Sequence, residues 1–310
     1  MRTFTFKGLF LTAVFMLLGC LSIQAANTKQ ITIKLDEAGT LPDRIGSSRK
    51  YKITNLKLVG EINGTDLRMI REMAGRDYRG DVTGGNLSVL DLSEAKIVTG
   101  GDYYYQYEKY YSDDDYSIYE SYTYNDEIGE YAFHDCSGLT SLTLPAGITS
   151  IGSHAFSYCS GLTSLTLPAG ITSIGDYAFY GCSGLTSLTL PAGITSIGDG
   201  AFEGCSGLTS IYVYAEKVPG IGSNAFKECD AKKCTVYVPK GTYDDYWLSE
   251  FGYFENIVEF DATGIDKTTT STDVKEVSRY SVNGQRLVGP TKGLNIVKYS
   301  DGSVKKVVVE

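Results

Sequence analysis

A unit of 23 residues is written three times in succession in the middle of this chain. Each copy reads Cys-Ser-Gly-Leu-Thr-Ser-Leu-Thr-Leu-Pro-Ala-Gly-Ile-Thr-Ser-Ile-Gly, followed by six looser positions around an Ala-Phe pair. The copies begin at Cys136, Cys159 and Cys182, and a diverging fourth copy begins at Cys205. A fixed period of this length predicts a solenoid, in which each coil buries its apolar side chains only against the neighbouring coils.

The apolar residues within a unit indicate which part of each coil is a strand. In the first clean copy they fall at Leu139, Leu142 and Leu144, with Ile148 following. This L-x-x-L-x-L spacing is the strand pattern of leucine-rich repeats. The same spacing occurs twice before the clean copies, beginning at Ile53 and at Leu87. We therefore predict a β-rich, right-handed solenoid of short parallel strands joined by turns and short helices.

Residues 1–25 have the composition of a signal peptide, with a short basic start and an apolar run too short to span a membrane comfortably. Two processing routes are open. Cleavage after small residues near Ala25 or Ala26 is the ordinary route, whereas Leu17-Leu18-Gly19-Cys20 resembles a bacterial lipobox, which would make Cys20 a lipidated N-terminus. Both routes predict an exported protein.

Residues 26–99 are expected to form an N-terminal cap with the two imperfect units. The alternating segment 31–35 predicts a strand. Between the imperfect units, Leu67, Ile70 and Met73 fall on one helical face, and Thr65 or Asp66 is a suitable N-cap.

Residues 100–126 interrupt the repeat with a segment rich in Tyr and Asp. It has almost no aliphatic residues, so we expect an insertion that projects from one coil and has no core of its own. A solvated loop is one interpretation, but ten tyrosines are more aromatic than disordered segments usually are. A binding role is the other, because Tyr offers a large rigid contact area and a hydroxyl. Calcium binding at residues 113–115 lacks the EF-hand spacing.

The repeat region is expected to span residues 127–260 and to end in a cap. The segment 243–247 predicts a short helix laid over the open end, which would otherwise expose apolar surface and strand edges. Residues 261–277 have linker composition. Residues 278–310 carry three strand patterns, and the turn signals Asn283-Gly284 and Asp301-Gly302 favour a small β unit.

Charge and cysteine usage exclude several classes of function. The net charge of −9 disfavours a nucleic-acid or anionic-membrane partner. Cysteines one period apart stack in a column, which predicts buried free thiols and provides no tetrahedral zinc site; a local Cys229–Cys234 bridge is the less favoured alternative. The two histidines, His134 and His154, are expected in exposed turns. No catalytic, metal or nucleotide motif is present, so we predict no enzyme, no cofactor and no metal site.

The outward strand positions are the candidates for binding within the coils. Thr143, Thr166 and Thr189 should align as a ladder that continues into Tyr212, with Tyr214 beside it. A β-branched surface that merely suits a sheet is one explanation; a flat, hydroxyl-lined ligand face ending in tyrosines is the other. The remaining candidate ligand-binding residues are the tyrosines of the insertion: Tyr103, Tyr104, Tyr105, Tyr107, Tyr110, Tyr111 and Tyr116.

The repeat Leu-x-x-Leu-x-Leu-Pro-x-x-Ile-x-x-Ile-Gly-x-x-Ala-Phe-x-x-Cys resembles the BspA-like (Treponema pallidum-type) leucine-rich repeats of bacterial surface proteins. The likeness covers about residues 127–258. The N-terminal part looks like that of such proteins from Bacteroidetes, and the tail around residues 280–294 resembles the C-terminal sorting-type domains of that phylum. The resemblance implies a surface protein associated with adhesion, and it carries over no functional residue.

These observations together predict an exported, non-catalytic cell-surface protein that binds another macromolecule. The expected partner is a protein, either of a host matrix or of another bacterial surface, and a membrane is reached only through a lipid anchor. Two alternatives stay open: a structural or self-associating surface component, and a glycan-binding module.

Overall fold

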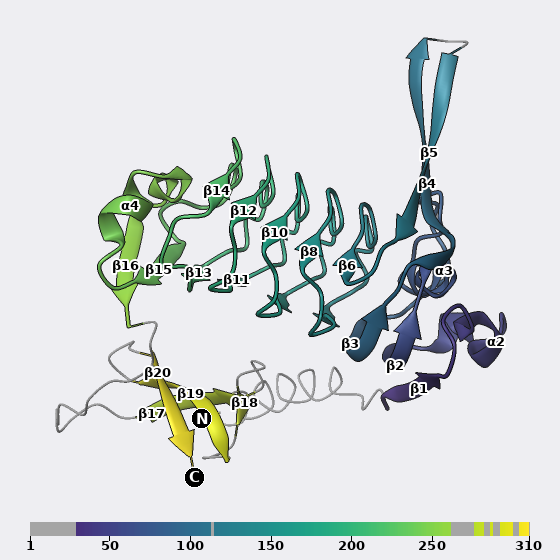
Figure 1. Ribbon diagram of the computed structural model, residues 1–310, viewed down its shortest axis with the longest axis horizontal. Coiled ribbons are helices and arrows are strands. Elements are labelled where there is room, and N and C mark those ends of the chain that lie inside the picture. Colours follow the sequence, from purple (N-terminus) through teal and green to yellow (C-terminus); the bar gives the residue numbers. More distant parts are fainter. Residues whose placement is uncertain are drawn as a thin grey trace, which may run out of the picture.

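The structure is a computed structural model that describes residues 29–112, 115–261, 276–281, 286–287, 292–299 and 304–309. The proposed signal peptide, Cys20, Asp113 and Asp114, most of the linker and the tail's turn signals lie outside these residues. The described chain forms a row of stacked coils with a long hairpin at one end, as predicted for a β-rich solenoid (Figure 1). No helix among the described residues is both long and apolar enough to span a bilayer.

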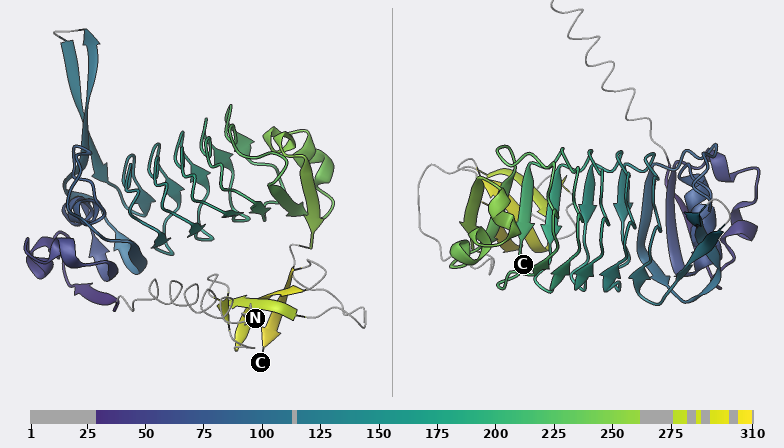
Figure 2. Two further views of the ribbon diagram at one scale, coloured as in Figure 1. Left: turned by 180° about the vertical axis from the view of Figure 1, so that it is seen from behind. Right: turned by 90° about the horizontal axis from the view of Figure 1, so that it is seen from above.

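Each coil contributes one strand to a parallel sheet that runs the length of the solenoid (Figure 2). Within the described residues this sheet has nine strands in the order β1-β2-β3-β7-β9-β11-β13-β15-β16. The strands are β1 (Ile31–Leu35), β2 (Asn55–Ile62), β3 (Val89–Ile97), β7 (Ser141–Thr143), β9 (Ser164–Thr166), β11 (Ser187–Leu190), β13 (Ser210–Val213), β15 (Thr235–Pro239) and β16 (Asn256–Phe260).

A second parallel sheet of two-residue strands lies on another side of the coils. Its order is β6-β8-β10-β12-β14, and equivalent residues of successive coils pair, as Ser150 does with Ser173. The Pro and Gly residues that follow β7, β9 and β11 turn the chain toward this second sheet. The strands are β6 (Glu127–Ile128), β8 (Ser150–Ile151), β10 (Ser173–Ile174), β12 (Ser196–Ile197) and β14 (Gly220–Ile221).

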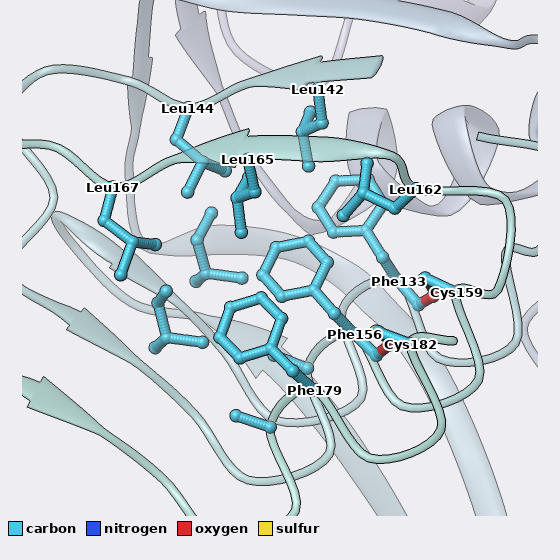
Figure 3. Packing of buried hydrophobic residues seen from close by; sticks show 14 of the residues in the cluster. Phe133, Leu142, Leu144, Phe156, Cys159, Leu162, Leu165, Leu167, Phe179 and Cys182 are labelled. Atoms are coloured by element: carbon cyan, nitrogen blue, oxygen red, sulfur yellow. Dashed lines mark hydrogen bonds between the residues drawn. The ribbon is translucent and has the colours of Figure 1, made fainter. Parts of the chain in front are cut away.

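Identical residues stack on one another through the core of the solenoid. The rings of Phe133, Phe156 and Phe179 are nearly parallel, with centroids 5.3 and 5.1 Å apart (Figure 3). The leucines of the long sheet pack over this phenylalanine stack. Because each ring fills the space above the next, every coil depends on both neighbours for burial.

The cysteine column is buried, and the six cysteines among the described residues are all free thiols. The expected column of buried thiols is therefore confirmed, and Cys229 and Cys234 are not bridged. Each of four thiols donates to the carbonyl of a phenylalanine in the preceding coil; the bond from Cys182 Sγ to the Phe156 oxygen is 3.1 Å long. Burial raises the pKa of Cys182 to about 12, so the thiolate is scarce at neutral pH.

The N-terminal end is closed by α2 (Leu41–Ile45) and α3 (Gly64–Met73). The prediction that Thr65 or Asp66 caps the second helix was wrong. Asn63 is the N-cap, and Asp66 is the third helical residue of a capping box. The buried Asp66 carboxylate also accepts hydrogen bonds from the backbone N–H groups of Gly39 and Leu41, which ties the introductory segment to the helix.

The C-terminal end is closed by α4 (Tyr243–Trp247), where a helix was predicted, and by a 3-10 turn, η2 (Glu250–Tyr253). Phe251 and Phe254 from this cap pack on Phe226, the last ring of the phenylalanine stack. A separate antiparallel sheet follows with the order β18-β17-β19-β20, formed by β17 (Glu276–Ser281), β18 (Arg286–Leu287), β19 (Gly293–Tyr299) and β20 (Val304–Val309).

Candidate functional site

The Tyr-rich insertion is a long antiparallel hairpin of β4 (Gly100–Ser112) and β5 (Asp115–Thr123). It stands out from the N-terminal end of the solenoid, beyond the row of coils (Figure 1). Aromatic residues suit a strand, and paired tyrosines such as Tyr107 and Tyr119 stack across the two strands at a centroid distance of 5.1 Å. The insertion is thus an ordered arm and not a loop.

Two of the predicted ligand-binding tyrosines, Tyr104 and Tyr105, lie in the core at the base of this arm. The prediction that they contact a ligand was wrong, because both rings are buried, against the turn at residues 129–135 and Arg71 of α3. The Tyr104 hydroxyl donates to the Glu130 carbonyl at 2.8 Å. In later coils the equivalent carbonyl accepts an N–H from the preceding coil, as the Ser153 oxygen does from Tyr131. Tyr104 therefore supplies the donor that a preceding turn would otherwise have provided.

The buried side chain of Arg71, from α3, completes this replacement. Its Nη1 atom donates to the carbonyls of Tyr131 and Ala132 at 2.8 and 3.1 Å, and its guanidinium lies 4.7 Å from the centre of the Tyr105 ring. The turns that follow the strands of the second sheet, residues 129–135 and their equivalents in later coils, form a hydrogen-bonded row that we call the turn row. Together, Arg71 and the two buried tyrosines cap its N-terminal end.

The other predicted tyrosines of the arm differ in exposure. Tyr103 and Tyr107 are half-buried; Tyr103 packs edge-on against Tyr78, with Arg68 near its ring. Toward the tip, the side chains of Tyr110, Tyr111 and Tyr116 are 64, 54 and 53% exposed. They lie on both faces of the hairpin: Tyr110 packs beside Tyr116 on one face, and the Tyr111 hydroxyl lies 2.7 Å from the Tyr119 hydroxyl on the other.

A groove of about 630 Å³ separates the β5 strand from the second sheet. Serines and glycines of successive coils form its floor, and the Tyr122 and Tyr124 rings of the arm stand on its wall. The glycines are required by coil stacking, since a Cβ atom on Gly152 would lie 2.7 Å from the backbone nitrogen of Glu130. The residues that line the groove include Glu120, Glu127, Glu130 and Asp176.

The predicted threonine ladder is present in the long sheet. Thr143 pairs with Thr166, Thr166 with Thr189, and Thr189 with Tyr212. The same column extends to Asp91 at one end and to Tyr237 at the other. The side chains of Thr143 and Thr166 are exposed and that of Thr189 is half-buried, which leaves a flat polar face.

Tyr212 and Tyr214 are less accessible than predicted. Tyr212 stacks on Tyr237 with centroids 4.5 Å apart, and Tyr214 packs edge-on against Phe260. Both tyrosines are half-buried, and burial raises the pKa of Tyr212 to about 12. The two tyrosines still form an aromatic end to the threonine ladder, but each ring already packs against another aromatic ring of the protein.

The candidates therefore form two separate surfaces. The arm adjoins the groove on the second sheet, whereas the threonine ladder belongs to the long sheet. Sequence alignment of the repeats predicted the ladder but could not place the arm relative to it.

An aromatic column on the turn row was missed. Tyr131, His154 and Tyr177 stack with centroid distances of 4.9 and 5.2 Å, and the column adjoins Tyr105 and Tyr107 of the arm. All three residues have positive φ, as does Gly200 in the next coil. The alignment of Gly200 with these three residues could have revealed the column, because a glycine at the equivalent position indicates a turn with left-handed backbone.

The histidines are not the exposed turn residues that were expected. Both are half-buried. Burial is the main cause of their lowered pKa values: the pKa of His134 falls to about 4, and that of His154 falls as well. Among the described residues, no three His, Cys, Asp or Glu side chains are grouped so as to hold a metal ion.

Comparison with known proteins identifies the repeats. The model of the BspA type leucine rich repeat region matches residues 126–245 in six copies. The resemblance read from the repeat is therefore confirmed for this part of the chain, and repeats of this class generally mediate contacts between proteins. No curated protein sequence matches the chain.

Solved structures of bacterial leucine-rich-repeat proteins are similar to parts of the chain. A Treponema pallidum leucine rich repeat protein is 26% identical with a TM-score of 0.35, and the match covers 44% of this chain and 66% of that one, just under two thirds. The pneumococcal vaccine antigen PcpA is 17% identical with a TM-score of 0.35, covering 75% and 68%. A leucine rich cell surface protein of Faecalibacterium prausnitzii is 20% identical with a TM-score of 0.25, covering 64% and 51%.

Proposed function

Because residues 126–245 are a BspA-type leucine-rich-repeat region, we propose that this protein is an exported, non-catalytic surface protein that adheres to other proteins. Its partners are host matrix proteins or surface proteins of other bacteria. The solenoid acts as a rigid scaffold, and the hairpin arm makes the main contact.

The observation that carries this proposal is the exposure of the tyrosines at the tip of the arm. Tyr110, Tyr111 and Tyr116 are each more than half exposed. Exposed tyrosines gathered on a rigid protrusion are favoured interface anchors, because a large contact area is gained at little loss of side-chain freedom. The threonine face of the long sheet offers a second, flatter contact surface.

Binding of the full chain to a panel of purified extracellular-matrix proteins tests the proposal. Replacing residues 108–118 by a two-residue Asn-Gly turn removes the tip and keeps the base. We expect this tip-trimmed variant to lose at least about tenfold in affinity. The variant Thr143→Val with Thr166→Val and Thr189→Val tests the second surface; because it removes only hydroxyls from the ladder, it should change affinity by only about twofold. Equal affinity of the tip-trimmed and unaltered proteins would contradict the role of the arm.

Self-association is the second candidate function, favoured by the two ends of the long sheet. Both terminal strands, β1 and β16, carry exposed apolar residues, with Ile31 41% and Val258 46% exposed. Open strand edges with apolar residues are templates for pairing with another chain. Sedimentation that shows a strict monomer at high concentration would count against this candidate.

A further inference from the structure

The groove between β5 and the second sheet is an acidic cleft with no cation of its own. Four carboxylates line it, from Glu120, Glu127, Glu130 and Asp176, and no Lys, Arg or His does. None of the four forms a salt bridge with any described residue. A concave wall of one charge sign concentrates its field in the cleft and attracts the opposite charge.

Aromatic rings add a second attraction for cations in the same place. Tyr122 and Tyr124 on the groove wall are 41 and 57% exposed. The base of the same hairpin already holds two guanidinium groups over tyrosine rings, Arg71 over Tyr105 at 4.7 Å and Arg68 over Tyr103 at 5.1 Å. Tyrosine rings of this arm therefore already bind arginine side chains, and the exposed rings on the groove wall can do the same for a partner.

The shape of the cleft selects an extended chain. Its floor includes serines and glycines, such as Ser150, Ser173 and Ser196, which repeat from coil to coil and have small side chains. A volume of about 630 Å³ spread over several coils accommodates a short stretch of polypeptide better than a folded surface.

We propose that this groove binds an extended, arginine- or lysine-rich segment of a partner protein. The proposal rests on the protein-binding function put forward above and names the chemistry of the partner. The carboxylates pair with the cationic side chains, the wall tyrosines stack on guanidinium groups, and the small floor residues allow the partner backbone to lie close. Nucleic acids and acidic polysaccharides are repelled by the same charges.

Titration of the full-length chain with a short synthetic peptide of alternating Arg and Thr tests the proposal. A peptide of the same length with Glu in place of Arg is the negative probe. We expect Glu127→Gln with Glu130→Gln to weaken binding of the Arg peptide by about tenfold. The matched control is Asp244→Asn with Asp245→Asn, two exposed residues of α4 at the far end of the solenoid, which change the net charge equally and should alter affinity by less than about twofold.

Three results would overturn the proposal: no binding of the Arg peptide at low salt, equal binding of the Glu peptide, or equal losses in the two double variants, which would indicate attraction by net charge alone. Failure here is distinguishable from failure of the proposed function. The tip-trimmed variant keeps the groove residues. If it loses matrix-protein binding while Glu127→Gln/Glu130→Gln binds as the unaltered protein does, the adhesive function is retained and the cationic partner is rejected.

Discussion

Single side chains replace the donors of a missing turn at the N-terminal end of the turn row. The coil before this row carries the helix α3 and not a turn, so the first turn, residues 129–135, has no preceding turn to pair with, and buried carbonyls without donors are costly. Tyr104 and Arg71 reach the carbonyls of Glu130, Tyr131 and Ala132 and supply those donors. Arg76 does the same for Asp135, whose carbonyl accepts from Nε at 3.2 Å.

We predict that Arg71→Met lowers the free energy of unfolding by about 3 kcal/mol, because it leaves buried carbonyls unpaired while it keeps most of the side-chain volume. Urea denaturation followed by circular dichroism measures the change. Arg68→Met is the control: its half-buried guanidinium lies over the Tyr78 ring at 3.9 Å, and its loss should cost less than about 1 kcal/mol. Equal costs for the two variants would mean that Arg71 is not a cap.

The second prediction at this scale concerns pH. Folding lowers the pKa of His134 from 6.5 to about 4, chiefly by burial and then by the nearby Arg71 charge. The folded protein therefore binds fewer protons than the unfolded chain between these values, so stability is complete above pH 6.5 and falls as the pH drops toward 4. After allowance for partial exposure, we expect a loss of about 1–2 kcal/mol between pH 7 and pH 5.

The variant His134→Phe removes this titration and keeps an aromatic ring among the rings of Tyr105, Tyr131 and Tyr158. Urea midpoints of the two proteins at pH 7 and pH 5 give the contribution of His134, because titration of the shared carboxylates cancels in the difference. If both proteins lost the same stability between pH 7 and pH 5, the prediction that His134 titration contributes to the loss would be wrong.

At the scale of elements, the hairpin arm has two parts with different roles. An isolated two-stranded hairpin is only marginally stable in water, so its base must be held by the solenoid. The buried rings of Tyr104 and Tyr105 anchor the base. Of the described residues between Glu108 and Ile118, all are exposed except the half-buried Ser117. The base is thus part of the fold and the tip is available for contact.

We therefore predict that the tip-trimmed variant keeps the stability of the unaltered protein to within about 0.5 kcal/mol, while Tyr104→Ala loses about 3–5 kcal/mol through the cavity and the unpaired Glu130 carbonyl. Thermal unfolding monitored by circular dichroism compares the two. A large loss of stability on trimming would indicate that the arm supports the solenoid along its whole length, and binding losses in that variant would then have to be interpreted as folding effects.

At the scale of the whole molecule, the solenoid should tolerate changes in the number of coils. Deleting residues 159–181 joins Tyr158 to Cys182 and removes one complete period. Because each coil contacts only its neighbours, we expect a cooperatively folded protein with a free energy of unfolding lower by about 2 kcal/mol. Deleting residues 165–176 instead breaks the period and should prevent folding. A folded product from both deletions would contradict the stacking in register of identical coils.

The architecture could be predicted from the repeats alone, because a periodic chain can bury its apolar residues only by stacking identical residues on one another. The strand positions, the phenylalanine and cysteine columns and the threonine ladder all follow from one unit, Cys136–Tyr158, and its copies. The short cap helix at Tyr243–Trp247 could also be predicted, because an open solenoid end must be covered.

Tertiary structure alone decided which tyrosines of the arm are available for binding. In sequence, Tyr104 and Tyr110 belong to one Tyr-rich segment, and nothing local separates them. Their roles differ because the turn at residues 129–135 has no preceding turn and packs on the base of the arm, which buries Tyr104 and leaves Tyr110 exposed. The acidic groove likewise exists only because the arm stands beside the second sheet, an arrangement that depends on contacts between distant parts of the chain and not on any repeat.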